Sequence, residues 1–215
     1  MQAAQSRARD IANALLRIGA VSLNPKQPYT WSSGLKSPIY CDNRLTISYP
    51  EIREMIADGF ANLIKEQYPD AELIAGAATG GIPHAALVAD RLKLPMVYVR
   101  SKPKGHGQGR MVEGVLPEGA KTIVIEDLIS TGGSSLRVAN AVNAEGGHTL
   151  AVAAIFTYEF DSAVQAFREA GIALHTLSNY STLIQEAAAS GSIDQEELAL
   201  LKRWKESPES YGTEG

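Results

Sequence analysis

Apolar residues follow two different periods along this chain, and the alternation between the periods predicts its architecture. Short apolar runs predict strands that are buried on both faces, over residues 73–78, 96–99, 122–125, 149–157 and 172–177. Other segments place an apolar residue at every third or fourth position, which predicts helices over residues 52–64, 85–92, 136–142 and 162–170. Strands that alternate with helices predict an α/β fold with a doubly wound parallel sheet.

Both ends of the chain depart from this alternation. Residues 3–18 predict a helix, and the short strand-like pieces at 21–23, 28–31 and 38–41 predict a hairpin-like flap after it. Two more helices are predicted over 179–189 and 194–205, and a polar tail begins at Ser207. We therefore expect a single domain over 1–215, with its helix and flap at 1–45, its α/β core at 46–178 and its C-terminal helices and tail at 179–215.

Two of the predicted helices have start signals. Ser48 precedes Glu51 by three positions, and Asp194 precedes Glu197 by the same distance. This is the spacing of a capping box, in which the two side chains each accept a hydrogen bond from the other residue's backbone. We expect helices to begin directly after Ser48 and after Asp194.

Composition and charge narrow the classes of function. With 215 residues, 45% of them hydrophobic, the chain is long enough for one sizeable core. Its formal net charge of -4 argues against nucleic acid as a partner, because nucleic-acid surfaces are basic. No apolar run approaches the roughly 20 residues of a membrane helix, so we expect no membrane partner. The single cysteine, Cys41, excludes an internal disulfide and indicates the reducing cytoplasm.

The most informative stretch joins a predicted strand to a predicted helix over residues 122–135. Glu126 and Asp127 follow the strand, and the small residues of 130–134 precede the helix. A loop at a helix N-terminus suits a phosphate, since it offers unpaired N–H groups, hydroxyls and the positive end of the helix dipole. The two carboxylates suit sugar hydroxyls and favour a nearby magnesium ion. Together they describe a cradle for ribose 5-phosphate, although the acids could also simply end a strand in water.

Two further segments offer groups for anions. Thr79, Gly80 and Gly81 form a second glycine turn between a strand and a helix, which suits another phosphate or serves packing alone. Residues 100–110 contain four cations, one histidine and three glycines, so we expect an exposed, mobile loop. This loop is either a solvated charge run, a basic patch for nucleic acid, or a lid that brings cations onto a ligand.

The stretch 122–135 resembles the motif by which type I phosphoribosyltransferases bind phosphoribosyl pyrophosphate (PRPP). The resemblance assigns the ribose hydroxyls to Glu126 and Asp127, and the 5-phosphate to residues Thr131, Gly132, Gly133 and Ser134. It includes the intervening Leu128, Ile129 and Ser130 in the PRPP site. It also makes the turn at Thr79 and Gly80 the pyrophosphate loop, although many relatives carry lysine in place of Gly80.

Residues 29–44 resemble the substrate hood of orotate phosphoribosyltransferases, and residues 100–107 resemble their catalytic loop. The hood implies a pyrimidine site, with Lys36 and Arg44 as candidates for the orotate carboxylate and Ser130 at the base. The loop matches at Arg100, Lys104 and His106. Many relatives carry other residues than this chain at Ser32, Gly80, Ser101 and Tyr158, so the residues that bind the orotate carboxylate stay open.

The resemblance implies the type I phosphoribosyltransferase fold and a magnesium-dependent transfer of ribose 5-phosphate from PRPP to orotate, in pyrimidine (UMP) biosynthesis. The catalytic residues would be Arg100, Lys104, His106 and Asp127, with Mg²⁺ held mainly by PRPP near Asp127. In the family the loop reaches into the neighbouring subunit, which implies a homodimer with a loop acting in trans. A purine phosphoribosyltransferase and a non-catalytic PRPP-binding regulator remain the alternatives, and the hood argues against the first.

Overall fold

The computed structural model describes residues 2–31, 34–102 and 110–211. Its centre is a six-stranded sheet in the order β10-β9-β8-β5-β6-β7, in which all neighbours are parallel except the pair β6 and β7. The strands are β5 (Leu73–Ala77), β6 (Met96–Val99), β7 (Val112–Glu113), β8 (Lys121–Ile129), β9 (His148–Thr157) and β10 (Ala173–Asn179). The predicted parallel sheet is confirmed, and the antiparallel edge strand β7 is an addition to it.

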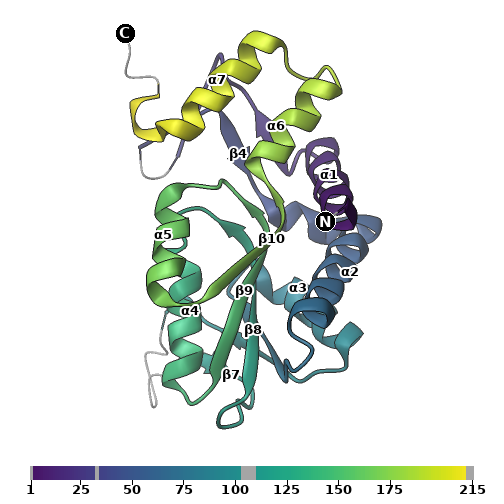
Figure 1. Ribbon diagram of the computed structural model, residues 1–215, viewed down its shortest axis with the longest axis vertical. Coiled ribbons are helices and arrows are strands. Elements are labelled where there is room, and N and C mark those ends of the chain that lie inside the picture. Colours follow the sequence, from purple (N-terminus) through teal and green to yellow (C-terminus); the bar gives the residue numbers. More distant parts are fainter. Residues whose placement is uncertain (1, 32–33, 103–109, 212–215) are drawn as a thin grey trace.

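Helices cover both faces of the sheet, as a doubly wound fold requires (Figure 1). The helices are α1 (Gln2–Arg17), α2 (Pro50–Gln67), α3 (Gly81–Leu92), α4 (Gly133–Ala144), α5 (Asp161–Ala170), α6 (Tyr180–Ala189) and α7 (Gln195–Glu206). One core packs under α1, α2 and α3, and a second under α4 and α5. Along β8, Ile123 and Ile125 belong to the first core and Val124 to the second. A central strand with both faces covered must be apolar at every position, which explains the uninterrupted run.

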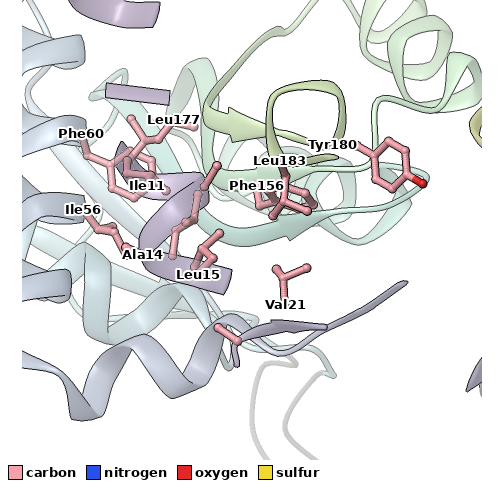
Figure 2. Packing of buried hydrophobic residues seen from close by; sticks show 14 of the residues in the cluster. Ile11, Ala14, Leu15, Val21, Ile56, Phe60, Phe156, Leu177, Tyr180 and Leu183 are labelled. Atoms are coloured by element: carbon pink, nitrogen blue, oxygen red, sulfur yellow. The ribbon is translucent and has the colours of Figure 1, made fainter. Parts of the chain in front are cut away.

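The first core joins the two ends of the chain to the sheet. Ile11 and Leu15 of α1 are fully buried beside Phe60 of α2, Phe156 of β9 and Leu183 of α6 (Figure 2). The N-terminal and C-terminal helices therefore share one hydrophobic core with the α/β unit.

The predicted flap is present as two small antiparallel pairs. Strand β1 (Val21–Leu23) pairs with β4 (Ile39–Cys41), and β2 (Tyr29–Thr30) pairs with β3 (Lys36–Ser37). We call residues 21–44 the hood; a 3-10 helix, η1 (Asn43–Ser48), begins at its last two residues. The hood lies beside α6 and α7 at one end of the molecule (Figure 1). There a second 3-10 helix, η2 (Pro208–Ser210), contacts β3.

The two predicted helix starts have different outcomes. At α7 the capping box is confirmed, because Asp194 accepts from the Glu197 N–H at 2.8 Å and Glu197 accepts from the Asp194 N–H at 2.9 Å. At α2 the prediction is wrong. Ser48 is the last residue of η1, and Tyr49 occupies the N-cap position without a side-chain hydrogen bond.

The strand that carries the acid pair is longer than the sequence predicts. It extends through Glu126 and Asp127 to Ile129, because β8 continues to pair with β9 up to Thr157. The two acids are therefore residues of the central strand itself. Among the described residues, none of the helices has the length and apolar character needed to cross a membrane.

Candidate active site

The sheet topology brings the two predicted anion turns together. Strands β5 and β8 are parallel neighbours, with Gly76 opposite Ile125. The turn at 78–80 leaves β5 and enters α3, and the turn at 130–132 leaves β8 and enters α4. Both turns therefore lie at the carboxyl edge of the sheet, where ligands bind in open α/β folds.

Glu126 is held from two sides and is almost out of contact with water. Its exposed fraction is 6%, its Oε1 accepts from the Asp127 N–H at 3.1 Å, and its Oε2 accepts from the buried Ser135 hydroxyl at 3.1 Å. Burial, and then the neighbouring Asp127 carboxylate, raise the pKa of Glu126 well above its usual range. The carboxyl of Glu126 is therefore oriented by the protein, and it keeps its proton to a higher pH than an exposed carboxyl does.

Asp127 is positioned by η1, which begins at the end of the hood. The Asn43 amide donates to the Asp127 carbonyl oxygen at 2.7 Å, and the Thr46 hydroxyl donates to the Asn43 carbonyl oxygen at 2.6 Å. The Thr46 oxygen also lies 3.2 Å from Nε2 of His84, which is fully buried and whose pKa burial lowers to about 4. The neutral His84 ring donates to Thr46, so a buried chain of hydrogen bonds ties α3 to η1 and β8.

The side chain of Asp127 points across to the first turn. A Cβ at position 80 would overlap the Asp127 carboxylate, so the carboxylate lies directly against the Gly80 backbone. A Cβ at position 81 would overlap the Ile125 carbonyl oxygen of the same strand. Glycine is thus required at both positions because groups of β8 lie against the backbone there. This close packing brings the N-terminus of α3 beside the acid pair.

A cavity of about 390 Å³ opens between these groups. Ten residues from the hood, the first turn, β8 and the start of α4 line it: Cys41, Asp42, Arg44, Ala78, Thr79, Gly80, Glu126, Asp127, Leu128 and Ser134. The lining combines three carboxylates, a guanidinium, hydroxyls and a helix N-terminus. This set can bind sugar hydroxyls and an anion in one place.

The second turn has the backbone of an anion site at the start of α4. Gly132 has a φ of +82°, which favours glycine, and its carbonyl accepts from the Leu136 N–H at 3.0 Å. Thr131, Gly133 and Ser134 are exposed at the helix N-terminus. Their backbone N–H groups and hydroxyls are available to a phosphate from solvent.

A second cavity of about 1070 Å³ adjoins the first and shares Cys41 and Leu128 with it. Its lining comes from the hood, the second turn, the β9–α5 connection and the end of α7. Tyr158 is 3% exposed and packs at a ring-centroid distance of 5.2 Å from Trp31 of the hood. The lining includes four aromatic residues, Trp31, Tyr40, Tyr158 and Phe160, which suit a planar base.

The predicted cations have different surroundings. The Arg44 guanidinium lines the smaller cavity and forms a bidentate ion pair with Asp42, at 2.7 and 2.9 Å. Lys36 lies on β3, where its Nζ donates to the Thr30 hydroxyl at 2.7 Å. Arg100 follows β6 and contacts Glu113 at 3.4 Å. Lys104 and His106 lie outside the described residues.

Several contributors to the site carry no recognisable sequence signal. Ser135 and Asn43 hold the two acids, and Lys205 lines the larger cavity from the far end of the chain. Asn43 and Lys205 are 84 and 46 residues from the groups that they bond, so a local pattern could not find them. Ser135 adjoins the predicted phosphate loop, and its inward direction becomes visible only with the helix in place.

The acid pair, Glu126 and Asp127, provides few protein ligands for the magnesium ion that it favours. Among residues 2–31, 34–102 and 110–211, no group of three His, Cys, Asp or Glu side chains gathers around a common point. Within the part of the chain that the structure describes, Glu126 and Asp127 are therefore not joined by a third side chain of these types. This fits an ion that takes most of its oxygen ligands from a phosphorylated substrate.

Comparison with known proteins agrees with this geometry. Residues 45–170 match the phosphoribosyl transferase domain family, which covers more than half of the chain. The fold and the site thus define a phosphoribosyltransferase.

The chain belongs, more particularly, to the orotate phosphoribosyltransferases. It is 56% identical over 205 residues to the orotate phosphoribosyltransferase of Enterococcus faecalis, covering 95% of this chain and 98% of the relative. It is 54% identical to that of Bacillus subtilis, covering 93% of each chain. The solved orotate phosphoribosyltransferase of Aeropyrum pernix aligns with a TM-score of 0.75 at 26% identity, over 86% of this chain and 99% of the other.

Proposed function

We propose that this enzyme transfers the 5-phosphoribosyl group of PRPP to orotate. The ring nitrogen of orotate gives up its proton and forms the new bond to the ribose anomeric carbon, and the bond from that carbon to pyrophosphate breaks, giving orotidine 5-phosphate, pyrophosphate and a proton. The observation that carries the proposal is the smaller cavity, where the acid pair of β8 meets the N-terminus of α3. The names of the relatives favour orotate over a purine base.

The smaller cavity would hold the ribose and the pyrophosphate of PRPP. Glu126 and Asp127 would accept from the ribose hydroxyls, since both carboxyls line this cavity and Glu126 is fixed by Ser135. The backbone of Thr79 and Gly80 would bind the pyrophosphate, because this chain has no lysine at position 80. The segment from Leu128 and Ile129 onward would continue the PRPP site to the second turn.

The second turn and the larger cavity would hold the two remaining parts of the substrates. Thr131, Gly132, Gly133 and Ser134 would bind the 5-phosphate at the start of α4. Ser130, which lines the larger cavity, would face the base.

Arg44 or Lys36 would neutralise the orotate carboxylate. Arg44 would do so by exchanging part of its pair with Asp42. Lys36 would instead have to leave the Thr30 hydroxyl to which it donates.

Magnesium would be held by PRPP oxygens with Asp127 nearby, and when bound it would neutralise charge on the departing pyrophosphate. The protein groups would act on the same charge. Arg100, Lys104 and His106 would close over the pyrophosphate, stabilise its growing charge and exclude water from the ribosyl cation-like centre. Lys104 or His106 would pass a proton to the leaving oxygen.

We further propose a homodimer in which Lys104 and His106 act in the partner's site, and a place in pyrimidine biosynthesis in the cytoplasm. The support is the match of residues 100–107 to the family's catalytic loop and the position of Arg100 beside the sheet edge strand β7. Subunit exchange, described in the Discussion, tests the shared site.

The reaction is tested by following orotate absorbance in the presence of PRPP and Mg²⁺, with adenine, hypoxanthine and uracil as parallel substrates. Loss of orotate that requires both PRPP and Mg²⁺ is the expected result. Turnover of another base but not of orotate would show that the hood binds that base instead of orotate. Binding of PRPP without any turnover would establish a regulator instead.

A further inference from the structure

The larger cavity has a wall that comes from the C-terminal end of the chain. Lys205, Glu206, Ser207, Pro208 and Glu209 line it, opposite the hood residues Trp31 and Tyr40. The end of α7 and the helix η2 therefore complete a pocket whose other sides belong to the hood and the second turn. Figure 1 shows α7 crossing beside the hood, away from the sheet.

Trp204 of α7 stands behind this pocket and backs its aromatic wall. It is fully buried, with ring-centroid distances of 5.9 Å to Trp31, 6.0 Å to Tyr158 and 5.4 Å to Phe160. All three of these residues line the larger cavity. The spacing between the hood and the β9–α5 connection is thus set by a ring from α7.

Lys205 fastens α7 to the same connection. Its Nζ donates to Glu159 Oε2 at 2.9 Å and to the Ser181 hydroxyl at 2.8 Å, and Glu159 Oε2 also accepts from the Ser181 N–H at 2.8 Å. Glu159 has a φ of +59°, which is uncommon for a residue with a side chain. The ion pair therefore holds the backbone immediately after Tyr158 in a specific conformation, with both side chains about 30% exposed.

The hood is also tied directly to the C-terminal segment. The Tyr211 hydroxyl donates to the Pro25 carbonyl oxygen at 2.7 Å, and Lys26 pairs with Asp194 at the start of α7. The exposed Lys26 pair contributes little, whereas the buried rings fix the geometry. Pro25, Lys26 and Trp31 of the hood thus each contact the C-terminal segment over residues 194–211.

We propose that Lys205 is a positioning residue for the pyrimidine base. Through Glu159 it fixes Tyr158 against Trp31, and so it sets the width of the orotate pocket without touching the PRPP half of the site. This inference rests on the proposed function. It predicts that loss of the Lys205–Glu159 pair weakens orotate binding and leaves PRPP binding unchanged.

The test compares Lys205→Ala with Lys202→Ala, an exposed lysine one turn earlier on α7. We expect Lys205→Ala to raise KM for orotate about tenfold, with KM for PRPP and kcat each within about twofold of wild type. Lys205→Arg should restore most of the affinity, and Lys202→Ala should match wild type. Equal changes in both KM values, or none, would overturn the proposal.

The Glu159→Gln variant distinguishes a positioning role of Lys205 from direct contact between Lys205 and orotate. If Lys205 acts through Glu159, this variant also raises KM for orotate. If Lys205 instead binds the orotate anion directly, the Glu159→Gln variant frees Lys205 from its ion pair. The KM for orotate then falls or stays unchanged, and the proposal fails. Wild-type protein that does not use orotate at all would refute the proposed function, a result distinct from failure of the variants.

A binding measurement independent of turnover is available because the chain's two tryptophans, Trp31 and Trp204, both lie at this wall. Orotidine 5-phosphate should change their fluorescence in the wild type. The same change should require about tenfold more ligand in Lys205→Ala. An unchanged midpoint in Lys205→Ala would count against the proposal, and thermal melting confirms that each variant is folded.

Discussion

The two glycine turns at the carboxyl edge of the sheet look alike in sequence but need their glycines for different reasons. At the first turn, Gly80 has an ordinary φ of -67°, and glycine is required because the Asp127 carboxylate lies against it. At the second, Gly132 has a φ of +82°, and an added Cβ would also meet the Phe167 ring at 2.8 Å. The first glycine makes room for a functional group of another strand, whereas the second shapes its own loop.

The different roles of Gly80 and Gly132 predict different effects of substitution at the two turns. A side chain at position 80 would push against the end of a short, functional side chain, which can move at little cost to the fold. A side chain at position 132 would strain the backbone and press on a buried ring. We therefore expect the first turn to be sensitive in activity and the second in stability as well.

Asp127 joins the two turns, and its removal should have the largest effect. Asp127→Ala should lower kcat/KM by about a thousandfold, because a carboxylate that orients the reacting ribose is lost. If the loop acts in trans, Lys104→Ala should also be inactive. Mixing the two inactive proteins should then restore about a quarter of wild-type activity, since half of the exchanged dimers carry one intact site. Proven subunit exchange without recovered activity would show that each site is built from one chain.

Gly80→Ala tests the close approach at the first turn. We expect activity to fall about 10- to 100-fold while the melting temperature stays within about 2 °C of wild type, because only the Asp127 carboxylate must move. Gly81→Ala is the matched variant. Its Cβ would overlap the Ile125 backbone carbonyl, so this protein should lose stability clearly. A strongly destabilised Gly80→Ala protein would contradict the distinction.

Gly132→Ala tests the second turn. The positive φ and the contact with Phe167 should cost about 1–3 kcal/mol in the free energy of unfolding, measured with urea. At Gly133 an added Cβ meets nothing closer than the Arg137 guanidinium at 3.7 Å. Gly133→Ala should therefore leave the free energy of unfolding nearly unchanged, whatever happens to phosphate binding.

Glu126, the residue before Asp127, should make the free energy of unfolding depend on pH. Because the folded pKa of Glu126 is raised above its unfolded value of 4.5, the folded state binds its proton more tightly. The contribution of Glu126 to the stability of the folded state is present below pH 4.5 and is lost as the pH rises through the folded pKa. The melting temperature of Glu126→Gln, relative to wild type, should therefore increase between pH 5 and pH 9. A difference that does not change with pH would show that Glu126 is ionised throughout.

The helix starts show how far local patterns can be trusted. Asp194 and Glu197 form the predicted capping box because Asp194 lies in the connection between α6 and α7 and belongs to no other helix or strand. Ser48 and Glu51 have the same spacing, yet Ser48 is taken up by η1, which the chain forms as it leaves the hood. A capping box is a local preference, and a tertiary arrangement worth more free energy overrides it. The two-residue strand β7 was missed because it has too few residues to show a period.

By itself, the sequence determined the parallel sheet, the two glycine turns and the acid pair. Apolar periodicity and turn residues act over a few neighbours, and the carboxyl ends of adjacent parallel strands necessarily meet at one edge. Only the tertiary structure decided that Glu126 is buried against Ser135, that Asp127 rests on Gly80, and that Lys205 reaches the pocket from α7. Such contacts join residues of different helices, strands and turns. They depend on packing between elements, which no local pattern encodes.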